Sequence, residues 1–473
     1  MAVHQPTGRM LRTEHSAIRL STTLLLGFAA LVAACFVTAA SYPGFMSYDS
    51  MQELLEARTF VDGSQYPPFG SYVWRLLDWI APGPTLMQFV QNGLLLFSVA
   101  YLLNRTRLHV GFLLACLLAF VAAPPILGTM LVVWKDVAVA ACYMAALALA
   151  VSISRTHGRE RNLVVAALSV FFVWCGMAYR FNAISGALSL IFYTVWKLRD
   201  ARGTGPRVVV SFAIALVCTA ILCAAVWVLN NYRLPGFERL ARNTNPDAII
   251  AYDLIGISAF SNQPIVPSAK GGFVSPGYLK SIYDPRHLNI TAANDHEHLV
   301  ARSVDHMWSR WLSAIASNPL AYLKHRASVF REYISLHQHE VFYVTQGGIA
   351  PNRLGITYTP TALSRRVVAY VWDARFSVFC RPWMYYVVAL AFVAALGVRR
   401  KAPYKLEAVV ALSSGYLYFA LMFFITPAAD LRYNLWSVSS AIIAIVFSIA
   451  GLVQGRRSEW REEAFDSTMQ ASK

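Results

Sequence analysis

The sequence predicts an α-helical polytopic membrane protein with about ten transmembrane helices and a mainly helical domain on the non-cytoplasmic side. Of its 473 residues, 57% are hydrophobic and only 14% are charged, whereas soluble domains carry about 25% charged residues. The apolar residues stand in long runs, and a run of about 20 crosses the hydrocarbon core of a bilayer. The basic residues stand in short clusters between these runs.

We place the expected spans on the apolar runs. They cover residues 18–40, 86–104, 110–131, 137–154, 162–179, 182–196, 207–230, 384–398, 406–426 and 435–454. The first run is expected to stay as an anchor, because it is longer than the roughly 7 to 15 apolar residues of a signal peptide and no clear cleavage site closes it. The expected domains are a transmembrane module at 1–230, an exported domain at 231–383, a second transmembrane module at 384–455 and a cytoplasmic tail at 456–473.

The Lys and Arg residues predict the orientation, because short loops rich in them stay in the cytoplasm. On the side of the N-terminus, three lie in the first tail, two at 105–107, three at 155–161, four at 197–207, four at 399–405 and four at 456–473. The short loops of the other side hold five, and the segment 231–383 is too long for the rule to apply. We therefore expect an inner (plasma) membrane protein with both termini cytoplasmic, and with loop 41–85 and domain 231–383 exported.

The net charge of +16 does not indicate a nucleic-acid partner. Such a partner needs basic residues gathered on one folded face, and here they are divided among loops. The seven cysteines form no CxxC pair and fall mostly inside the expected spans, so we expect no disulfide framework. The sequence has no P-loop and no HExxH motif, and so gives no indication of nucleotide-driven or zinc-protease chemistry.

The first exported loop, 41–85, contains a predicted amphipathic helix. Ser50 is its expected cap, Glu53 completes a capping box, and apolar residues then recur on one face. Asp49 is expected just ahead of this helix, near the outer membrane surface. A second short helix carries two tryptophan residues that are expected at the membrane interface, Trp74 and Trp79.

Short exported turns carry ionisable residues against the ends of apolar spans. These residues are Lys135 and Asp136 before the fourth span, Arg180 after the fifth, and Arg432 and Tyr433 before the last. An unbalanced charge inside the bilayer is costly, so such residues usually pair or line a wet cavity. We expect them to converge with Asp49 on one cavity. The alternative is simple anchoring at the membrane surface.

The exported segment 231–383 is long enough to fold on a core of its own. Its apolar pattern predicts a helix near 295–317 and another near 319–335, which opens with Asn318-Pro319. Histidine and acidic residues also cluster at 295–298, at His306 and at 337–340, in a manner that invites a metal interpretation. For His298, Arg302 and Asp305 we favour the polar face of an ordinary helix.

Four motifs resemble those of one family. They are YPGFMSYDS with the following Tyr66-Pro67-Pro68, WKD at 134–136, YRFNA at 179–183 and DLRYNLW at 430–436. With the order of spans and loops, they resemble bacterial membrane glycosyltransferases of the C fold (GT-C), of the protein-mannosyltransferase and aminoarabinose-transferase type. The resemblance implies transfer of a sugar from a polyprenyl-phosphate donor to an envelope glycan, lipid or protein. Membrane lipids are expected as further partners, and the division of the basic residues among loops excludes nucleic acid as an expected partner.

The resemblance and the chemistry of sugar transfer together assign expected roles. A carboxylate must position or deprotonate the acceptor, and Asp49 is the candidate. Guanidinium groups match a departing phosphate, so the candidates for the donor phosphate are Arg432 and Arg180, with Lys135 as a further charge. The candidates for orienting the acceptor are Asp136, Glu53, Tyr66 and Tyr433.

One departure from the family concerns metal binding. Many members carry two adjacent acidic residues in the first exported loop, whereas Asp49 stands between Tyr48 and Ser50, and Glu53 lies one helical turn away. This weakens the case for a metal held between paired carboxylates. We therefore assign no cofactor and leave a divalent metal open.

Two other classes of function stay open. A transporter or flippase of a lipid-linked sugar should hold its charges near the bilayer midplane, often on broken helices within an inverted repeat. Here the charges lie at one face and no repeat is visible, although Pro124-Pro125 do break a helix. A non-catalytic scaffold for envelope assembly predicts instead that Asp49 and Arg432 can be replaced without loss of function.

Overall fold

A computed structural model of the chain describes residues 7–62, 67–204, 207–231, 238–239, 245–301, 306–399 and 402–471. Over these residues the chain is almost entirely helical, which confirms the expectation of a helical membrane protein. The two strands in this part of the chain are the two-residue segments β1 (Val61–Asp62) and β2 (Glu238–Arg239), which pair in parallel.

Seven helical segments are long and apolar enough to cross a membrane. They are Leu20–Ala40 within α1 (Thr7–Ala40), α4 (Thr85–Arg105), α7 (Lys135–Ser152), α8 (Arg159–Tyr179), α10 (Val208–Asn231), α18 (Lys405–Ile425), and Leu431–Arg456, which joins η4 (Leu431–Asn434) to α19 (Leu435–Ala471). The count of seven comes from length and composition within the described residues, and the expected count of ten is not confirmed.

The expected span 110–131 is broken into two helices. The helices α5 (Val110–Ala122) and α6 (Pro124–Met130) meet at an angle of 64°. Pro124 has no N–H to continue the ladder of α5, and it moves the preceding Ala123 out of helical geometry, to φ −59° and ψ 121°. If this bent pair is one span, the number of candidate spans rises to eight.

Two further expected spans do not reach the length or composition of a straight crossing. The helix α17 (Pro382–Val398) is apolar, but its 17 residues are fewer than the roughly 20 that span the hydrocarbon. The helix α9 (Ile184–Ala201) ends on Lys197, Arg199 and Asp200, and is not among the candidate spans. Both helices pack on α18 within the bundle.

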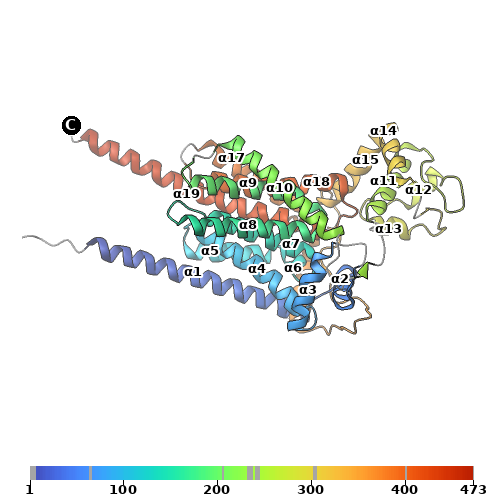
Figure 1. The fold of residues 1–473 in the computed structure, drawn as a ribbon, viewed down its shortest axis with the longest axis horizontal. Coiled ribbons are helices and arrows are strands. Elements are labelled where there is room, and N and C mark those ends of the chain that lie inside the picture. Colours follow the sequence, from blue (N-terminus) through green and yellow to red (C-terminus); the bar gives the residue numbers. More distant parts are fainter. Residues whose placement is uncertain are drawn as a thin grey trace, which may run out of the picture.

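The two ends of the bundle differ. The N-terminal end of α1 and the C-terminal end of α19 lie together at one end (Figure 1). The other end carries α2 (Tyr48–Thr59), α3 (Phe69–Ile80) and a separate group of helices, which are α11 (Asn245–Ser261), α12 (Pro276–Ile282), α13 (Leu288–Ala293), α14 (Met307–Ser317) and α15 (Pro319–Tyr333). The candidate site lies at this second end.

The helices α11, α12, α14 and α15 enclose a second apolar core, separate from the core of the bundle. The helix expected near 319–335 is present as α15, which begins at Pro319 with the proline in its first turn. The helix expected near 295–317 was wrong for residues 295–301 and is present as α14 over Met307–Ser317, whereas Arg302 and Asp305, which were expected on its polar face, lie outside the described residues. Residues 295–301 form turns in which the Asp295 carboxylate accepts hydrogen bonds from the backbone N–H groups of Leu299 and Val300. These bonds compete with the bonds of a helix.

A buried ionic network stabilises this second group of helices. The Asp253 carboxylate of α11 lies 2.7 Å from Nε of Arg326 and 3.0 Å from Nε2 of His325, and it accepts a hydrogen bond of 2.8 Å from the Trp311 indole. Asp253, His325 and Arg326 are all fully buried. Arg326 also donates a 3.0 Å hydrogen bond to the carbonyl of Thr426, just after α18. The same guanidinium therefore links these helices to the bundle.

We expect Asp253→Ala to cost about 3 to 5 kcal/mol of stability, because it leaves the Arg326 charge buried without its partner. Thermal unfolding of the purified protein in detergent measures the effect. The matched control is Asp200→Ala, which removes a carboxylate 2.5 Å from an exposed guanidinium, that of Arg155. Exposed pairs contribute little, so this control should unfold like the wild type. Equal losses in the two variants would contradict the prediction.

Candidate active site

The helix α2 begins earlier than its capping pattern predicts. Its N-cap is Ser47, and Ser50 lies inside the first turn, so the predicted capping box of Ser50 and Glu53 was wrong. The Ser50 hydroxyl instead donates a 2.6 Å hydrogen bond to the carbonyl of Val133. Asp49 is therefore in the first turn of α2, not ahead of it. A carboxylate at this position is stabilised by the positive end of the helix dipole.

The start of α2 is attached to the segment that precedes α7. The N–H of Val133 donates to the carbonyl of Phe45 at 2.9 Å, and the Trp134 indole donates to the Ser47 hydroxyl at 2.8 Å. Lys135 and Asp136 follow directly, at the N-terminus of α7. These bonds bring the first loop of the chain against the WKD motif.

The tryptophans of the following helix differ in environment. Trp79 is 84% exposed, as a residue at a membrane interface would be, whereas Trp74 is fully buried and donates to the carbonyl of Gly83 at 3.2 Å. The expectation that both lie at the interface was therefore wrong for Trp74. Its side chain packs α3 against the start of α4.

Arg432 is the centre of one group of charges. Its Nη1 atom lies 2.7 Å from Oδ2 of Asp49, and its Nε and Nη2 atoms each lie 3.1 Å from Oδ2 of Asp430. The guanidinium carbon stands 4.9 Å from the ring centre of Trp134, in a cation–π contact. Arg432 is thus held in one orientation by two carboxylates and an indole.

Arg180 is the centre of a second group. Its Nη1 atom donates to both oxygens of Asp136, at 2.8 and 2.9 Å, and its Nε atom donates to the side-chain oxygen of Asn182 at 3.0 Å. The ring of Tyr433 contacts both groups, with its centre 4.6 Å from the guanidinium carbon of Arg180 and 5.0 Å from that of Arg432. The electron-rich faces of this ring stabilise two like charges that would otherwise repel each other.

Lys135 and Glu53 lie beside these two groups, on the side of the protein interior. Both side chains are buried. Burial raises the pKa of the Glu53 carboxyl, against the opposing effect of the Lys135 ammonium. A Cβ at Gly70 would stand 1.6 Å from Oε1 of Glu53, so any larger residue at this position of α3 would displace the carboxyl from its present position.

From here on, the charged cluster means six side chains at this end of the bundle. They are Asp49, Lys135, Asp136, Arg180, Asp430 and Arg432. The structure brings together all the candidates that the sequence suggested for the donor phosphate, and it places Asp49, Asp136, Glu53 and Tyr433 with them. Tyr66 lies outside the described residues. The two carboxylates that contact Arg432 differ in exposure, since the Asp49 side chain is 23% exposed and that of Asp430 only 3%. Of the two, Asp49 is therefore the more accessible to a substrate.

Sequence reasoning missed Asp430 and His287 as members of this site. Nε2 of His287 lies 3.9 Å from Oδ1 of Asp430. Burial lowers the pKa of the His287 imidazole, against the opposing effect of Asp430. Asp430 stands two residues before Arg432, which is a weak signal in the sequence. His287 had no signal, because backbone hydrogen bonds between residues 286–288 and 427–429 bring it there.

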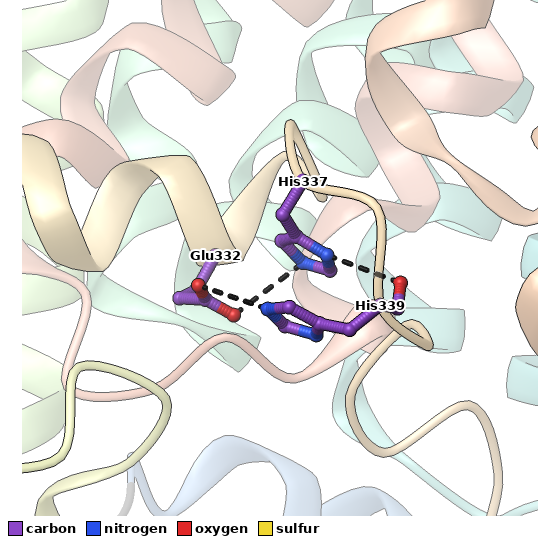
Figure 2. Close-up of side chains that lie close together, drawn as sticks. All are labelled: Glu332, His337 and His339. Atoms are coloured by element: carbon purple, nitrogen blue, oxygen red, sulfur yellow. Dashed lines mark hydrogen bonds and ion pairs between the residues drawn. The ribbon is translucent and has the colours of Figure 1, made fainter.

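Within the described residues, one group of side chains has the composition and spacing to hold a metal ion. It comprises Glu332, His337 and His339, whose ligand atoms lie within 4.8 Å of one another (Figure 2). None of the three belongs to the charged cluster. The acidic and histidine residues at 295–298 do not form such a group, since the Asp295 carboxylate is taken up by backbone N–H groups and by the hydroxyl of Tyr278.

No protein-family model matches this sequence, and no curated protein shows significant similarity to it. The chemistry of the charged cluster is therefore derived from its own residues and geometry.

Proposed function

We propose that the protein is a membrane glycosyltransferase, which moves a sugar from a polyprenyl-phosphate donor to an envelope acceptor. The single observation that carries this proposal is the charged cluster, in which cationic and carboxylate side chains from four segments meet at one end of the bundle. A lipid-phosphate donor has its chain in the membrane and its charged group at the surface, and the charged cluster lies at the ends of the apolar helices α7 and α8, where such a group would stand.

Arg432 and Arg180 are the proposed ligands of the donor phosphate, with Lys135 adding a third positive charge. In the transfer, the bond between the sugar C1 and the phosphate oxygen breaks, and a bond forms between C1 and the acceptor. The departing phosphate gains negative charge, which fixed guanidinium groups stabilise. Arg432 is already oriented by Asp430 and Trp134, so little reorganisation is needed when a phosphate binds.

Asp49 is the proposed general base. It is the most exposed carboxylate of the charged cluster that contacts Arg432, and a phosphate oxygen that took its place on Nη1 would release it toward the acceptor. The released carboxylate accepts the proton of the acceptor group as the new bond forms. Asp136, Glu53, Tyr66 and Tyr433 are proposed to orient the acceptor and the groups around it.

The function is tested with purified full-length protein in detergent or vesicles. A labelled polyprenyl-phosphate sugar is supplied with an envelope fraction as acceptor, and release of polyprenyl phosphate is measured together with transfer of the sugar. The proposal predicts that both products appear at equal rates and only when acceptor is present. Transport of the intact donor across sealed vesicles without release of phosphate would support the transporter instead.

A transporter is favoured by one observation, the 64° break between α5 and α6. Transporters often build their sites on such breaks, with charges near the middle of the bilayer. The segment 110–130, however, contains no Asp, Glu, Lys or Arg. The charges lie instead at the ends of α7, α8 and η4. The bent pair itself therefore carries no charged side chain for a transport site at the middle of the bilayer, which favours the enzyme over the transporter.

The proposed orientation places both termini in the cytoplasm and the helices α11 to α15 outside the inner membrane. We expect a cysteine introduced at the exposed Lys270 to react with a membrane-impermeant maleimide in intact cells. A cysteine at Arg155, on a loop of the cytoplasmic side, should react only after permeabilisation. The unmodified protein, with its own cysteines, supplies the background in both cases. The opposite pattern would place the charged cluster in the cytoplasm and rule out the proposed reaction.

A further inference from the structure

The loop after α15 brings three metal-ligating side chains together. Glu332 lies in the last turn of α15, and His337 and His339 follow in the loop, with all three pointing toward one another (Figure 2). Nε2 of His337 lies 3.4 Å from Oε2 of Glu332, and Nε2 of His339 lies 3.4 Å from Oε1. Two ligands about 2.1 Å from a tetrahedral zinc ion stand about 3.4 Å apart. Each imidazole therefore already stands at that spacing from one oxygen of the carboxylate.

The second nitrogen of each imidazole determines which atom faces Glu332. Nδ1 of His337 lies 3.1 Å from the carbonyl oxygen of His339, and Nδ1 of His339 lies 3.2 Å from that of Glu340. A carbonyl oxygen accepts only, so the proton of each neutral ring is on Nδ1 and the lone pair of Nε2 faces the carboxylate. Metal-binding histidines are oriented in this way, by a hydrogen bond from the nitrogen that does not bind the metal.

Two of the potential ligand atoms are buried, Nε2 of His337 and Oε2 of Glu332. The His337 side chain is only 3% exposed, and neither its Nε2 atom nor Oε2 of Glu332 makes a hydrogen bond in the structure. Buried polar atoms of folded proteins nearly always have a partner. The lone pairs of the two Nε2 atoms and the negative carboxylate of Glu332 repel one another. A cation placed between them would attract all three groups. The arrangement therefore points to a bound cation.

The loop that carries the histidines is held in place by two guanidinium groups. Arg381 donates hydrogen bonds to the backbone carbonyls of Ser335, His337, Gln338 and His339. Arg331 donates to the carbonyl of Leu336 at 2.9 Å. These bonds fix the backbone from which both imidazoles project. Binding of an ion therefore costs little conformational entropy for ordering this loop.

The group opens onto a cavity of about 840 Å³, lined by Glu332, His337 and His339 together with Arg331, Arg381 and Trp383. The cavity offers an entry path for the ion and room for a further ligand. Three protein ligands with one open position is the pattern of zinc sites that exchange a water or a substrate, as opposed to closed structural sites.

We propose that Glu332, His337 and His339 bind one divalent transition-metal ion of the zinc class, with one coordination position open to the cavity. Two imidazoles favour Zn²⁺ over Mg²⁺ and Ca²⁺, which prefer oxygen ligands. The two rings stack with their centres 3.5 Å apart, so His339 has to turn out of the stack for both lone pairs to meet the ion. Its side chain is 53% exposed and has the freedom to turn. The proposal does not depend on the proposed transferase activity.

The test uses the full-length protein, purified in detergent, stripped with a chelator and titrated with zinc chloride. We expect one Zn²⁺ per chain, and binding at least about tenfold weaker in His339→Ala and in Glu332→Gln. Cobalt chloride should give the visible absorption of a four-coordinate Co²⁺ ion, and both variants should lose it. The matched control is His296→Ala, which removes another exposed histidine and should bind Zn²⁺ like the wild type.

His339 is half exposed, so its replacement is not expected to disturb folding, and the stripped His339→Ala and wild-type proteins should have the same unfolding temperature. Equal affinity of Zn²⁺ for these two proteins would overturn the proposal. So would displacement of Zn²⁺ by an equal concentration of Mg²⁺, because a site with two imidazole ligands should discriminate strongly between these ions.

Discussion

Arg432→Ala is expected to lower transferase activity about 10²- to 10³-fold, the typical loss when one preorganised donor to a developing oxyanion is removed. Arg432 contacts two carboxylates, the Trp134 ring and the Tyr433 ring, so its guanidinium is held in a fixed orientation. Arg432→Lys should restore only part of the activity, because lysine keeps the charge but loses the planar fork that matches a phosphate. The measurement is release of polyprenyl phosphate per folded, membrane-inserted protein.

The control for this series is Arg58→Ala. Arg58 also holds a carboxylate, with its Nη2 atom 2.8 Å from Oδ1 of Asp78, but this pair joins α2 to α3 outside the charged cluster. We expect full specific activity in Arg58→Ala. If Arg432 only anchors a span end at the membrane surface, Lys would replace it fully and Ala would lower expression more than specific activity. Equal activity of wild type, Arg432→Ala and Arg432→Lys would remove Arg432 from the site.

Asp49→Asn is expected to lower activity about 10²- to 10⁴-fold, the usual contribution of a general base. Asparagine keeps the size and shape of the side chain but cannot take the proton of the acceptor. The same variant should bind the donor at least as tightly as the wild type, because Arg432 loses the carboxylate that lies 2.7 Å from it and competes with the phosphate. Activity and donor binding are measured on the same preparation. This opposite response of binding and turnover separates a base from a residue that merely holds the donor.

The matched control is Asp78→Asn, which changes a carboxylate of the same loop that is paired with Arg58 and hydrogen-bonded to the N–H of Gly83. It should keep both donor binding and turnover. A loss of donor binding in Asp49→Asn would instead mean that Asp49 orients Arg432. Unchanged turnover in Asp49→Asn would leave the proposed mechanism without its base.

The sequence predicted that the charged residues at the span ends would lie close together. It did not predict which carboxylate contacts which guanidinium group. The WKD motif, Arg180 and Arg432 all stand at span ends, and alternate crossing places those ends on one side. Which carboxylate each guanidinium contacts depends on side-chain positions at a scale of about 3 Å, and no spacing encodes that. The sequence therefore suggested Arg432 and Asp49 for one site, but the contact of Asp430 with Arg432 and the approach of His287 appeared only in the structure.

The local predictions failed for two different reasons, a competing contact between distant segments and a proline within an apolar run. The capping box at Ser50 was a sound local prediction, but the carbonyl of Val133 takes the serine hydroxyl and α2 begins at Tyr48. The straight span at 110–131 met the length requirement, but Pro124 bends it. The grouping of Glu332 with His337 and His339 depends on the carbonyl contacts of Arg381, which is more than 40 residues away in the sequence.

The sequence by itself determined that this chain is a helical membrane protein, because the partition of an apolar run into lipid depends mainly on the length and composition of that run, which are local properties. Only the tertiary structure decided where α2 begins, how Asp49, Asp430 and Arg432 pair, and which histidines meet Glu332. These features rest on hydrogen bonds and ion pairs between segments far apart in the chain. The strength of such contacts depends on distance and direction in space, and neither can be read from the order of residues.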